Sequence, residues 1–309
     1  MDKQKILVVV GPTASGKTAL AIELAKIYNG EIISADSMQI YKGLDIATAK
    51  PTAAEMCEIP HHLIGFLNSD EKFSVADYLT LANEKIVEIL SRQKLPIIAG
   101  GTGLYVSSLV DNIQFDDTVS DEKIRQRLYD EAKTKGNQFL LEKLKKIDEE
   151  TAATLHQNNI TRIIRALEYF EITGKKLSSQ KILSKAVESP YEFTIIGLNF
   201  LDRKELYDRI DERVEIMLKT GLINEVKTVY ESQNLKTAHQ AIGYKELIPY
   251  FQKTSSLDEC IAKIKQETRH YAKRQLTWFR RDERINWIYI DKTLTIENII
   301  EKCKKVIAF

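Results

Sequence analysis

The sequence ILVVVGPTASGKT occupies residues 6–18 and carries the strongest indication of the fold. Residues 6–10 are apolar and rich in valine, which is typical of a buried strand. The pattern Gly-x4-Gly-Lys-Thr follows at Gly11–Thr18, and an amphipathic run from Thr18 to Tyr28 comes next. A strand, a glycine-rich loop and a helix in this order form a P-loop, which binds a di- or triphosphate.

The chemistry of the loop explains why it suits phosphate. Gly11 and Gly16 let successive backbone N–H groups point inward, and the helix that begins near Lys17 adds its positive end. The Lys17 ammonium can reach the terminal phosphates, and the Thr18 hydroxyl suits Mg²⁺ as a ligand. We therefore predict a diphosphate site formed by Gly11, Pro12, Thr13, Ala14, Ser15, Gly16, Lys17 and Thr18. The loop alone does not say whether the phosphates belong to ATP or to another pyrophosphate.

Composition limits the class of protein. The 309 residues can hold two domains or one core with an insertion, and the hydrophobic and charged fractions are those of an ordinary globular chain. No apolar run approaches the roughly 20 residues that a membrane helix needs, so we expect no membrane association. Cys57, Cys260 and Cys303 are widely spaced, which favours a reducing cytoplasm over a disulfide framework.

Charge is distributed unevenly, although the net charge is only +1. Basic side chains crowd the segment Ile261–Arg284, and Tyr271, Trp278 and Phe279 lie among them. Such a segment suits a phosphate-rich polymer, but it also suits a solvated basic helix whose aromatic residues face the core. Charge alone leaves both interpretations open.

Short apolar runs separated by helical patterns indicate an α/β fold, a P-loop NTPase-like parallel sheet flanked by helices. The predicted strands are Ile6–Val10, Glu31–Ser34, Pro96–Ala99, Phe193–Leu198 and Ile285–Ile290. Residues 116–190 lack strand signals and predict an all-helical insertion domain, with helices at Asp121–Thr134, Asn137–Ile147, Glu149–Leu155 and Ile160–Thr173. The catalytic core is then discontinuous, formed by residues 1–115 and 191–309.

Three further patterns carry candidate chemistry. Asp36 follows a predicted strand, so it is either a base or Mg²⁺ partner in the ligand crevice or a helix N-cap. Thr102, in the run Gly100–Tyr105, can donate to a phosphate oxygen. Arg209 and Arg213 lie four residues apart on one helix face, where they either clamp phosphate or pair with neighbouring acids.

Together these motifs closely resemble the tRNA dimethylallyltransferases. The matching stretches are GPTASGKT, SADSMQIYKGLDI with TAKP, PHHLI, GGTGLY, RALEYFEITGK, LYDRIDERVEIMLKTGLINEV, AIGYKE and YAKRQLTWFRRD. They run from residue 11 to residue 282 in the order of the family, so the resemblance covers nearly the whole chain.

The resemblance implies a reaction. The family moves a dimethylallyl group from dimethylallyl diphosphate to N6 of adenosine 37 in the tRNA anticodon loop, and the P-loop then holds the pyrophosphate that leaves. Asp36 is implied as the general base, Thr102 as a contact at the reacting centre, and Arg209 as a neutralising charge on the pyrophosphate. Lys17 and Thr18 keep the roles given above, with Mg²⁺ as cofactor.

The resemblance also implies tRNA contacts and a place in the cell. In the core these are Asp36, Ser37, Met38, Gln39 and Thr102, with Arg274 in the basic segment. In the insertion, which resembles the anticodon-loop domain of the family, they are Arg125, Thr161, Arg162, Ile163, Ile164 and Arg165. Thr161 stands where the family commonly has glutamine. We expect a monomeric, cytoplasmic enzyme of the bacterial type.

Three rival functions share parts of this pattern. A small-molecule P-loop kinase would share the loop and the fold. An adenylate isopentenyltransferase would share the chemistry but act on free nucleotides, which need no clamp for an anticodon. A non-enzymatic RNA-binding module would not need Lys17, Thr18, Asp36 and Thr102 together at one strand edge.

Overall fold

The computed structural model describes residues 3–115, 120–184, 187–232, 241–291 and 293–307. The chain divides into two compact units: a core unit, Met1–Leu109 with Pro190–Phe309, and a helical unit, Val110–Ser189. The N- and C-terminal parts of the chain therefore build the core unit together.

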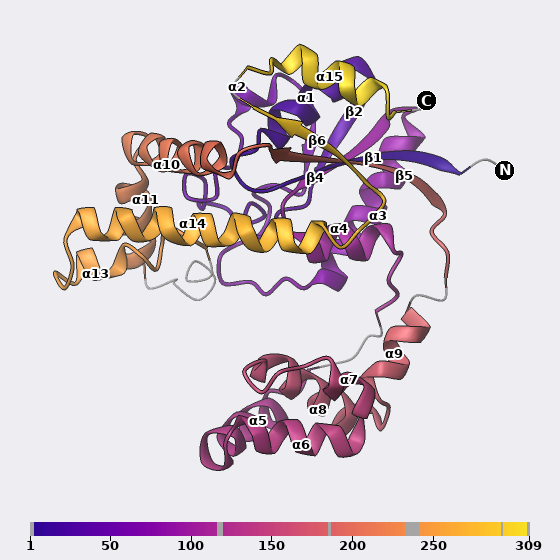
Figure 1. Cartoon of the computed structure of the whole chain (residues 1–309), viewed down its shortest axis with the longest axis vertical. Helices are drawn as coiled ribbons and strands as arrows, with labels where there is room; N and C mark the ends of the chain where they lie inside the picture. The colour runs from indigo at the N-terminus through magenta and orange to yellow at the C-terminus, as the bar shows by residue number, and fades with distance from the viewer. Residues whose placement is uncertain (1–2, 116–119, 185–186, 233–240, 292, 308–309) are drawn as a thin grey trace. The chain divides into compact units, whose positions relative to one another are not determined.

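A six-stranded, wholly parallel sheet forms the centre of the core unit (Figure 1). Its strand order is β3 (His61–His62), β2 (Gly30–Ser34), β4 (Leu95–Gly100), β1 (Gln4–Val10), β5 (Tyr191–Phe200) and β6 (Ile285–Ile290). The predicted fold class is confirmed. The edge strand β3 was not predicted, because two histidines carry no apolar run for a pattern to detect.

The central strand β1 explains why the sheet is buried on both faces. Ile6–Val10 are wholly inaccessible, and β1 pairs with β4 on one side and β5 on the other. Strands that helices cover on both faces read as continuous apolar runs rather than as alternating patterns. Figure 1 shows α1 (Lys17–Ile27) and α15 (Ile296–Lys304) on one side of the sheet, with α3 (Val75–Ser91) and α4 (Gly103–Val110) on the other.

A second apolar cluster lies beside the sheet in the core unit. It joins the segment around Ile40–Leu44 to α10 (Arg203–Lys219), α11 (Leu222–Glu231) and the first half of α14 (Leu257–Phe279). The short helices α2 (Ala53–Met56) and α13 (Ile248–Phe251) complete the described helices of this unit. The length of α14 matters for the site, because its second half reaches the loops that follow the strands.

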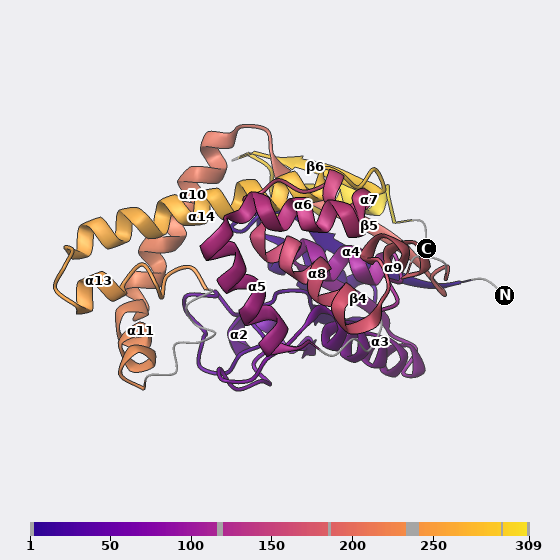
Figure 2. The ribbon, with the colours of Figure 1, turned by 90° about the horizontal axis from the view of Figure 1, so that it is seen from below.

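The helical unit packs its own core (Figure 2). Its helices are α5 (Glu122–Lys135), α6 (Asn137–Ile147), α7 (Glu149–Ala153), α8 (Ile160–Thr173) and α9 (Leu177–Ser184). Leu128, Leu140, Leu144 and Leu167 are wholly buried between them. Gly174 ends α8 in the left-handed conformation with φ 70°, which glycine adopts without strain. The sequence did not predict α9.

Candidate active site at the carboxyl edge of the sheet

The P-loop joins β1 to α1 with the geometry that its glycines permit. Gly11 has φ 148°, and a Cβ there would lie 2.6 Å from the carbonyl oxygen of Leu198. Gly16 caps α1 at φ 85°. Both positions therefore require glycine, the first for a close backbone approach and the second for a left-handed conformation.

Two side chains of the loop are poised for a charged ligand. The Lys17 ammonium donates a hydrogen bond to the carbonyl oxygen of Pro12 at 2.8 Å. Burial and, to a smaller extent, the charge of Arg213 lower the pKa of Lys17 to about 7, although the charge of Asp36 opposes the shift. The hydroxyl of Ser15 is buried and has no hydrogen-bond partner among the described residues. A buried hydroxyl without a partner and an ammonium whose charge is disfavoured by its surroundings both favour a bound anion.

The two predicted arginines of α10 have different surroundings. Arg213, on α10, is half-buried; burial lowers its pKa, and the charges of Asp36 and Glu55 oppose the shift. Arg209, one turn earlier, is exposed, and its guanidinium lies 5.6 Å from the ring centre of Phe200. The structure thus groups Arg213 with Lys17 and Asp36, and it places Arg209 against an aromatic ring.

The loop after β2 holds Asp36 in place. One carboxylate oxygen, Oδ1, accepts hydrogen bonds from the backbone N–H groups of Met38 at 2.9 Å and Gln39 at 3.3 Å. Asp36 therefore caps a turn, because residues 37–40 form turns, and the predicted helix N-cap is wrong. Its carboxylate also lies within the electrostatic reach of Lys17 and Arg213.

Thr102 connects the loops that follow β2 and β4. Its hydroxyl accepts a hydrogen bond from the backbone N–H of Ser37 at 2.9 Å, and its own N–H donates to the carbonyl oxygen of Ala35 at 3.0 Å. Gly100 makes this approach possible, since a Cβ there would lie 2.2 Å from the Ala35 oxygen. The structure thus brings Asp36, Ser37 and Thr102 together.

Helix α14 contributes residues that sequence reasoning did not select. Gln275 is buried; its Oε1 accepts from the N–H of Thr13 at 2.8 Å, and its Nε2 donates to the carbonyl oxygen of Gly101 at 3.0 Å. Burial raises the pKa of Tyr271, as does the charge of Asp36, while a hydrogen bond with Thr102 opposes the shift. The stretch YAKRQLTWF was recognised as a motif, but a motif does not say which of its residues face the site.

The basic segment divides between core and surface. Phe279 is buried, and Trp278 lies against Gly103, where a Cβ would be 2.3 Å from the indole. Arg274 is exposed, with its guanidinium 5.7 Å from the ring centre of Tyr271. Both interpretations of the segment hold in part, because aromatic residues pack inward while cations remain at the surface.

Predicted tRNA contacts in the helical unit differ in their exposure. Thr161 and Arg162 are exposed. Ile163 and Ile164 are almost wholly buried in the core of the unit, so the prediction that they contact tRNA does not hold for their side chains.

Two arginines of this unit meet a buried acid. Arg125 donates to both carboxylate oxygens of Glu168, at 3.1 and 3.2 Å, and Arg165 lies 3.5 Å from the same carboxylate. Glu168 is wholly buried. Arg125 and Arg165 therefore stabilise the helical unit whether or not they also contact a ligand.

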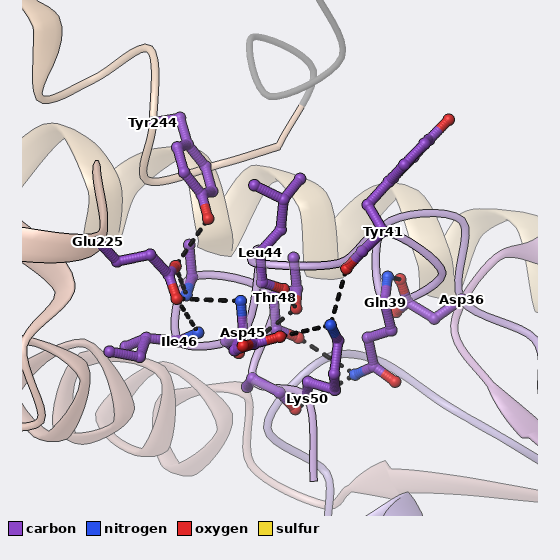
Figure 3. Close-up of polar contacts among 12 residues, drawn as sticks. Asp36, Gln39, Tyr41, Leu44, Asp45, Ile46, Thr48, Lys50, Glu225 and Tyr244 are labelled. Atoms are coloured by element: carbon purple, nitrogen blue, oxygen red, sulfur yellow. Dashed lines mark hydrogen bonds and ion pairs between the residues drawn. The ribbon is translucent and has the colours of Figure 1, made fainter. Parts of the chain in front are cut away.

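The carboxylate of Glu225 secures the segment that follows the Asp36 loop (Figure 3). It accepts hydrogen bonds from the successive N–H groups of Asp45, Ile46 and Ala47, at 3.0, 2.7 and 3.1 Å. Sequence reasoning included Glu225 only within a longer motif.

The described residues lack two features, a membrane-spanning helix and a cluster of metal ligands. None of their helices is long and apolar enough to cross a membrane. Nor do they contain a group of three or more histidine, cysteine, aspartate or glutamate side chains that could hold a metal ion.

The fold and this site define a P-loop α/β protein whose loop is built for a phosphorylated ligand. The chain belongs to the family of the tRNA dimethylallyltransferases: the matching family model, described as IPP transferase, covers residues 39–282. The tRNA dimethylallyltransferase of Acetivibrio thermocellus is 50% identical over 305 residues, which are 98% of this chain and 97% of that protein.

Solved structures agree with this assignment. A tRNA delta(2)-isopentenylpyrophosphate transferase from Staphylococcus epidermidis superposes with a TM-score of 0.71 at 42% identity, covering 98% of each chain. A eukaryotic dimethylallyltransferase acting on tRNA gives a TM-score of 0.84 at 31% identity, covering 97% of this chain and 77% of the other. The resemblance inferred from the motifs is confirmed.

Proposed function

We propose that this protein transfers a dimethylallyl group from dimethylallyl diphosphate to N6 of adenosine 37 in the anticodon loop of tRNA, releasing diphosphate. Family membership supports the reaction. The observation that carries it to particular residues is the grouping of Lys17, Arg213 and Asp36 beside the P-loop. Two cations next to one carboxylate suit a reaction in which an anion leaves and a proton is taken up.

The leaving-group side of this proposal rests on the loop and Arg213. The backbone N–H groups of Gly11–Thr18, with Lys17 and Arg213, hold the diphosphate and stabilise the charge that grows on it as the allylic C–O bond breaks. Arg213 shares the neutralising role that the resemblance implies for Arg209, because the charge of Arg213 acts on Lys17. Ser15 supplies a further hydroxyl beside the phosphates.

The nucleophile side rests on Asp36 and Thr102. N6 of adenine attacks the allylic carbon, forming the new C–N bond, and its proton passes to the Asp36 carboxylate. Thr102, hydrogen-bonded to the loop of Asp36, fixes the position of that loop and lies beside the reacting centre. Ser37, Met38 and Gln39 line the place of the base, which must leave its stack to reach the site.

The protein residues near the P-loop could bind Mg²⁺ only together with oxygen atoms of the diphosphate. Thr18 is exposed at the first turn of α1, and the buried Ser15 hydroxyl has no partner among the described residues. Since those residues contain no acidic cluster for a metal, Thr18 and diphosphate oxygens would hold the ion together. Bound there, Mg²⁺ would neutralise charge on the leaving diphosphate.

The tRNA side of the proposal assigns the anticodon loop to the helical unit. Exposed Thr161 and Arg162, half-buried Arg125 and exposed Arg165 supply phosphate and base contacts, and Arg274 supplies a contact from the core unit. We place the enzyme in the cytoplasm, where its tRNA substrate is found, and propose that it acts as a monomer.

The test is mass analysis of an anticodon stem-loop RNA after incubation with the protein, dimethylallyl diphosphate and Mg²⁺. An RNA with adenosine at positions 36 and 37 should gain one dimethylallyl group at position 37, and an RNA with guanosine at 37 should gain none. Prenylation of free AMP without RNA modification would favour an adenylate isopentenyltransferase. Phosphate release from ATP without prenylation would favour a kinase.

A further inference from the structure

Glu225, on α11, accepts four hydrogen bonds from residues outside its own helix. Its Oε2 accepts from the N–H groups of Asp45 and Ile46, and its Oε1 accepts from the N–H of Ala47 and the phenol of Tyr244, at 2.7 Å (Figure 3). Each carboxylate oxygen offers about two acceptor positions. The described contacts therefore use the acceptor capacity of Glu225 in full.

The segment that Glu225 holds is also stabilised by hydrogen bonds between its own residues. Thr48 Oγ1 donates to the carbonyl oxygen of Leu44 at 2.6 Å, and the Lys50 ammonium donates to the carbonyl oxygen of Tyr41 at 2.7 Å (Figure 3). Lys50 also forms an ion pair with Asp45. These bonds make residues 41–50 a compact loop, and Glu225 holds the backbone of its residues 45–47.

Gln39 connects this loop to the catalytic aspartate. The Gln39 amide nitrogen donates to the carbonyl oxygens of Thr48 at 3.1 Å and Ala49 at 3.2 Å. The backbone N–H of Gln39 donates in turn to Asp36 Oδ1 at 3.3 Å. Hydrogen bonds and the short stretch of backbone from residue 45 to residue 49 thus link Glu225 through Gln39 to Asp36.

We propose that Glu225 is a positioning residue for the transfer reaction, which fixes Asp36 and Gln39 by holding residues 45–47. The inference rests on the proposed function, since it takes Asp36 as the base and Gln39 as a contact of the adenine. Glu225 does not touch the diphosphate loop in any described contact. Glu225 therefore affects the orientation of Asp36 and of the adenine, and it leaves the binding of dimethylallyl diphosphate unchanged.

The chemistry of the side chain makes the proposal testable with close substitutions. Glu225→Gln replaces one acceptor oxygen by an NH₂ group that would face backbone N–H donors, so at least one of them loses its partner. Glu225→Asp keeps both oxygens on a shorter stem. Tyr244→Phe removes one hydrogen bond and leaves the three backbone contacts. Glu231→Gln, in an exposed pair with Lys227 at the end of α11, is the matched control.

The experiment measures single-turnover transfer at saturating anticodon stem-loop RNA and dimethylallyl diphosphate, together with the dissociation constant of the diphosphate. We expect Glu225→Gln to lower the single-turnover rate about 10- to 100-fold, with donor affinity within about twofold of the wild type. Glu225→Asp should recover part of the rate, Tyr244→Phe should lose less than Glu225→Gln, and Glu231→Gln should match the wild type.

Other outcomes overturn the proposal in distinguishable ways. A wild-type single-turnover rate in Glu225→Gln overturns the positioning role alone. Parallel losses of rate, donor affinity and melting temperature, without recovery in Glu225→Asp, also overturn it, because they indicate general destabilisation. An inactive wild-type protein overturns the proposed function instead, and faster hydrogen exchange at amides 45–47 in Glu225→Gln would then support only the anchoring of the loop.

Discussion

The buried side chain of Gln275 accepts a hydrogen bond from the backbone N–H of Thr13 at 2.8 Å, which joins α14 to the P-loop. The same amide donates to the carbonyl oxygen of Gly101, so one side chain fixes the spacing of the two loops. A Cβ at Gly101 would lie 2.1 Å from the amide nitrogen, which explains the glycine. The two loops are thus held by a residue that lies 262 positions from Thr13 and 174 positions from Gly101 in the sequence.

Replacing Gln275 should therefore disturb catalysis. Gln275→Ala leaves the N–H of Thr13 and the oxygen of Gly101 without this partner, at about 1–3 kcal/mol for each buried group. We expect kcat/KM to fall about 10- to 100-fold in steady-state prenylation assays. Gln266→Ala, at an exposed position of the same helix, serves as the control. Equal activity of the two variants would contradict the bridging role.

Substitution of Lys17 should reduce turnover at least as severely as substitution of Asp36. The allylic carbon can carry developing positive charge, so stabilisation of the leaving diphosphate should dominate. We expect single-turnover rates to fall about 100- to 1,000-fold in Lys17→Ala, and by no more than that in Asp36→Ala. Near-normal chemistry in Lys17→Ala would show that the cation is dispensable for bond cleavage.

Removal of diphosphate should abolish metal binding. The described residues offer Thr18 and no acidic cluster, so a divalent ion needs phosphate oxygens as further ligands. With Mn²⁺ as a paramagnetic probe, we expect binding to the protein only when diphosphate is present, and weaker binding in Thr18→Ala. Tight Mn²⁺ binding to the protein alone would mean that another site exists.

Glu31 should stabilise the core unit in a pH-dependent manner. Burial raises the pKa of this carboxyl, but hydrogen bonds from Arg92, His62 and Lys94 outweigh it and lower the pKa to about 2. Because the folded pKa lies below the ordinary value of 4.5, this stabilisation is complete above pH 4.5 and is lost as the pH falls towards 2.

Urea unfolding of Glu31→Gln checks this contribution. At pH 7 the variant should lose about 1–3 kcal/mol of unfolding free energy, since it leaves the cations of Arg92 and Lys94 facing a neutral amide. The difference from wild type should shrink at pH 3. Glu84→Gln, at an exposed position on α3, should show no such change. A difference that does not vary with pH would exclude the ionised carboxylate as its source.

Substitution of two arginines of the helical unit should have different effects on tRNA binding and on thermal stability. Arg162 is exposed, so Arg162→Ala should raise the KM for tRNA several-fold and leave the melting temperature unchanged. The slope of log KM against log salt concentration should fall by about one, as expected for the loss of one phosphate contact. Arg125 contacts the buried Glu168, so Arg125→Ala should lower the melting temperature as well. Thermal unfolding and tRNA kinetics on both variants separate the two effects, and equal melting temperatures would argue against the ion pair.

The sequence predicted the elements that local patterns define. The apolar runs of β1, β2, β4, β5 and β6 were visible because each strand is buried on one or both faces. The strand β3 was not predicted, since its formation depends on pairing with β2 and not on its own composition. The same limit applies to Arg209 and Arg213, which share a helix face, so the sequence cannot say which turn of α10 approaches the P-loop.

By itself, then, the sequence determined the P-loop, the parallel α/β class, the helical insertion and the family. Each follows from residues near one another in the chain, through glycine conformation, hydrophobic period and motif order. Only the tertiary structure decided that Arg213, Tyr271 and Gln275 join Lys17, Asp36 and Thr102. The reason is that parallel strands bring their carboxyl ends to one edge of the sheet, and the packing of α10 and α14 selects which of their side chains meet there.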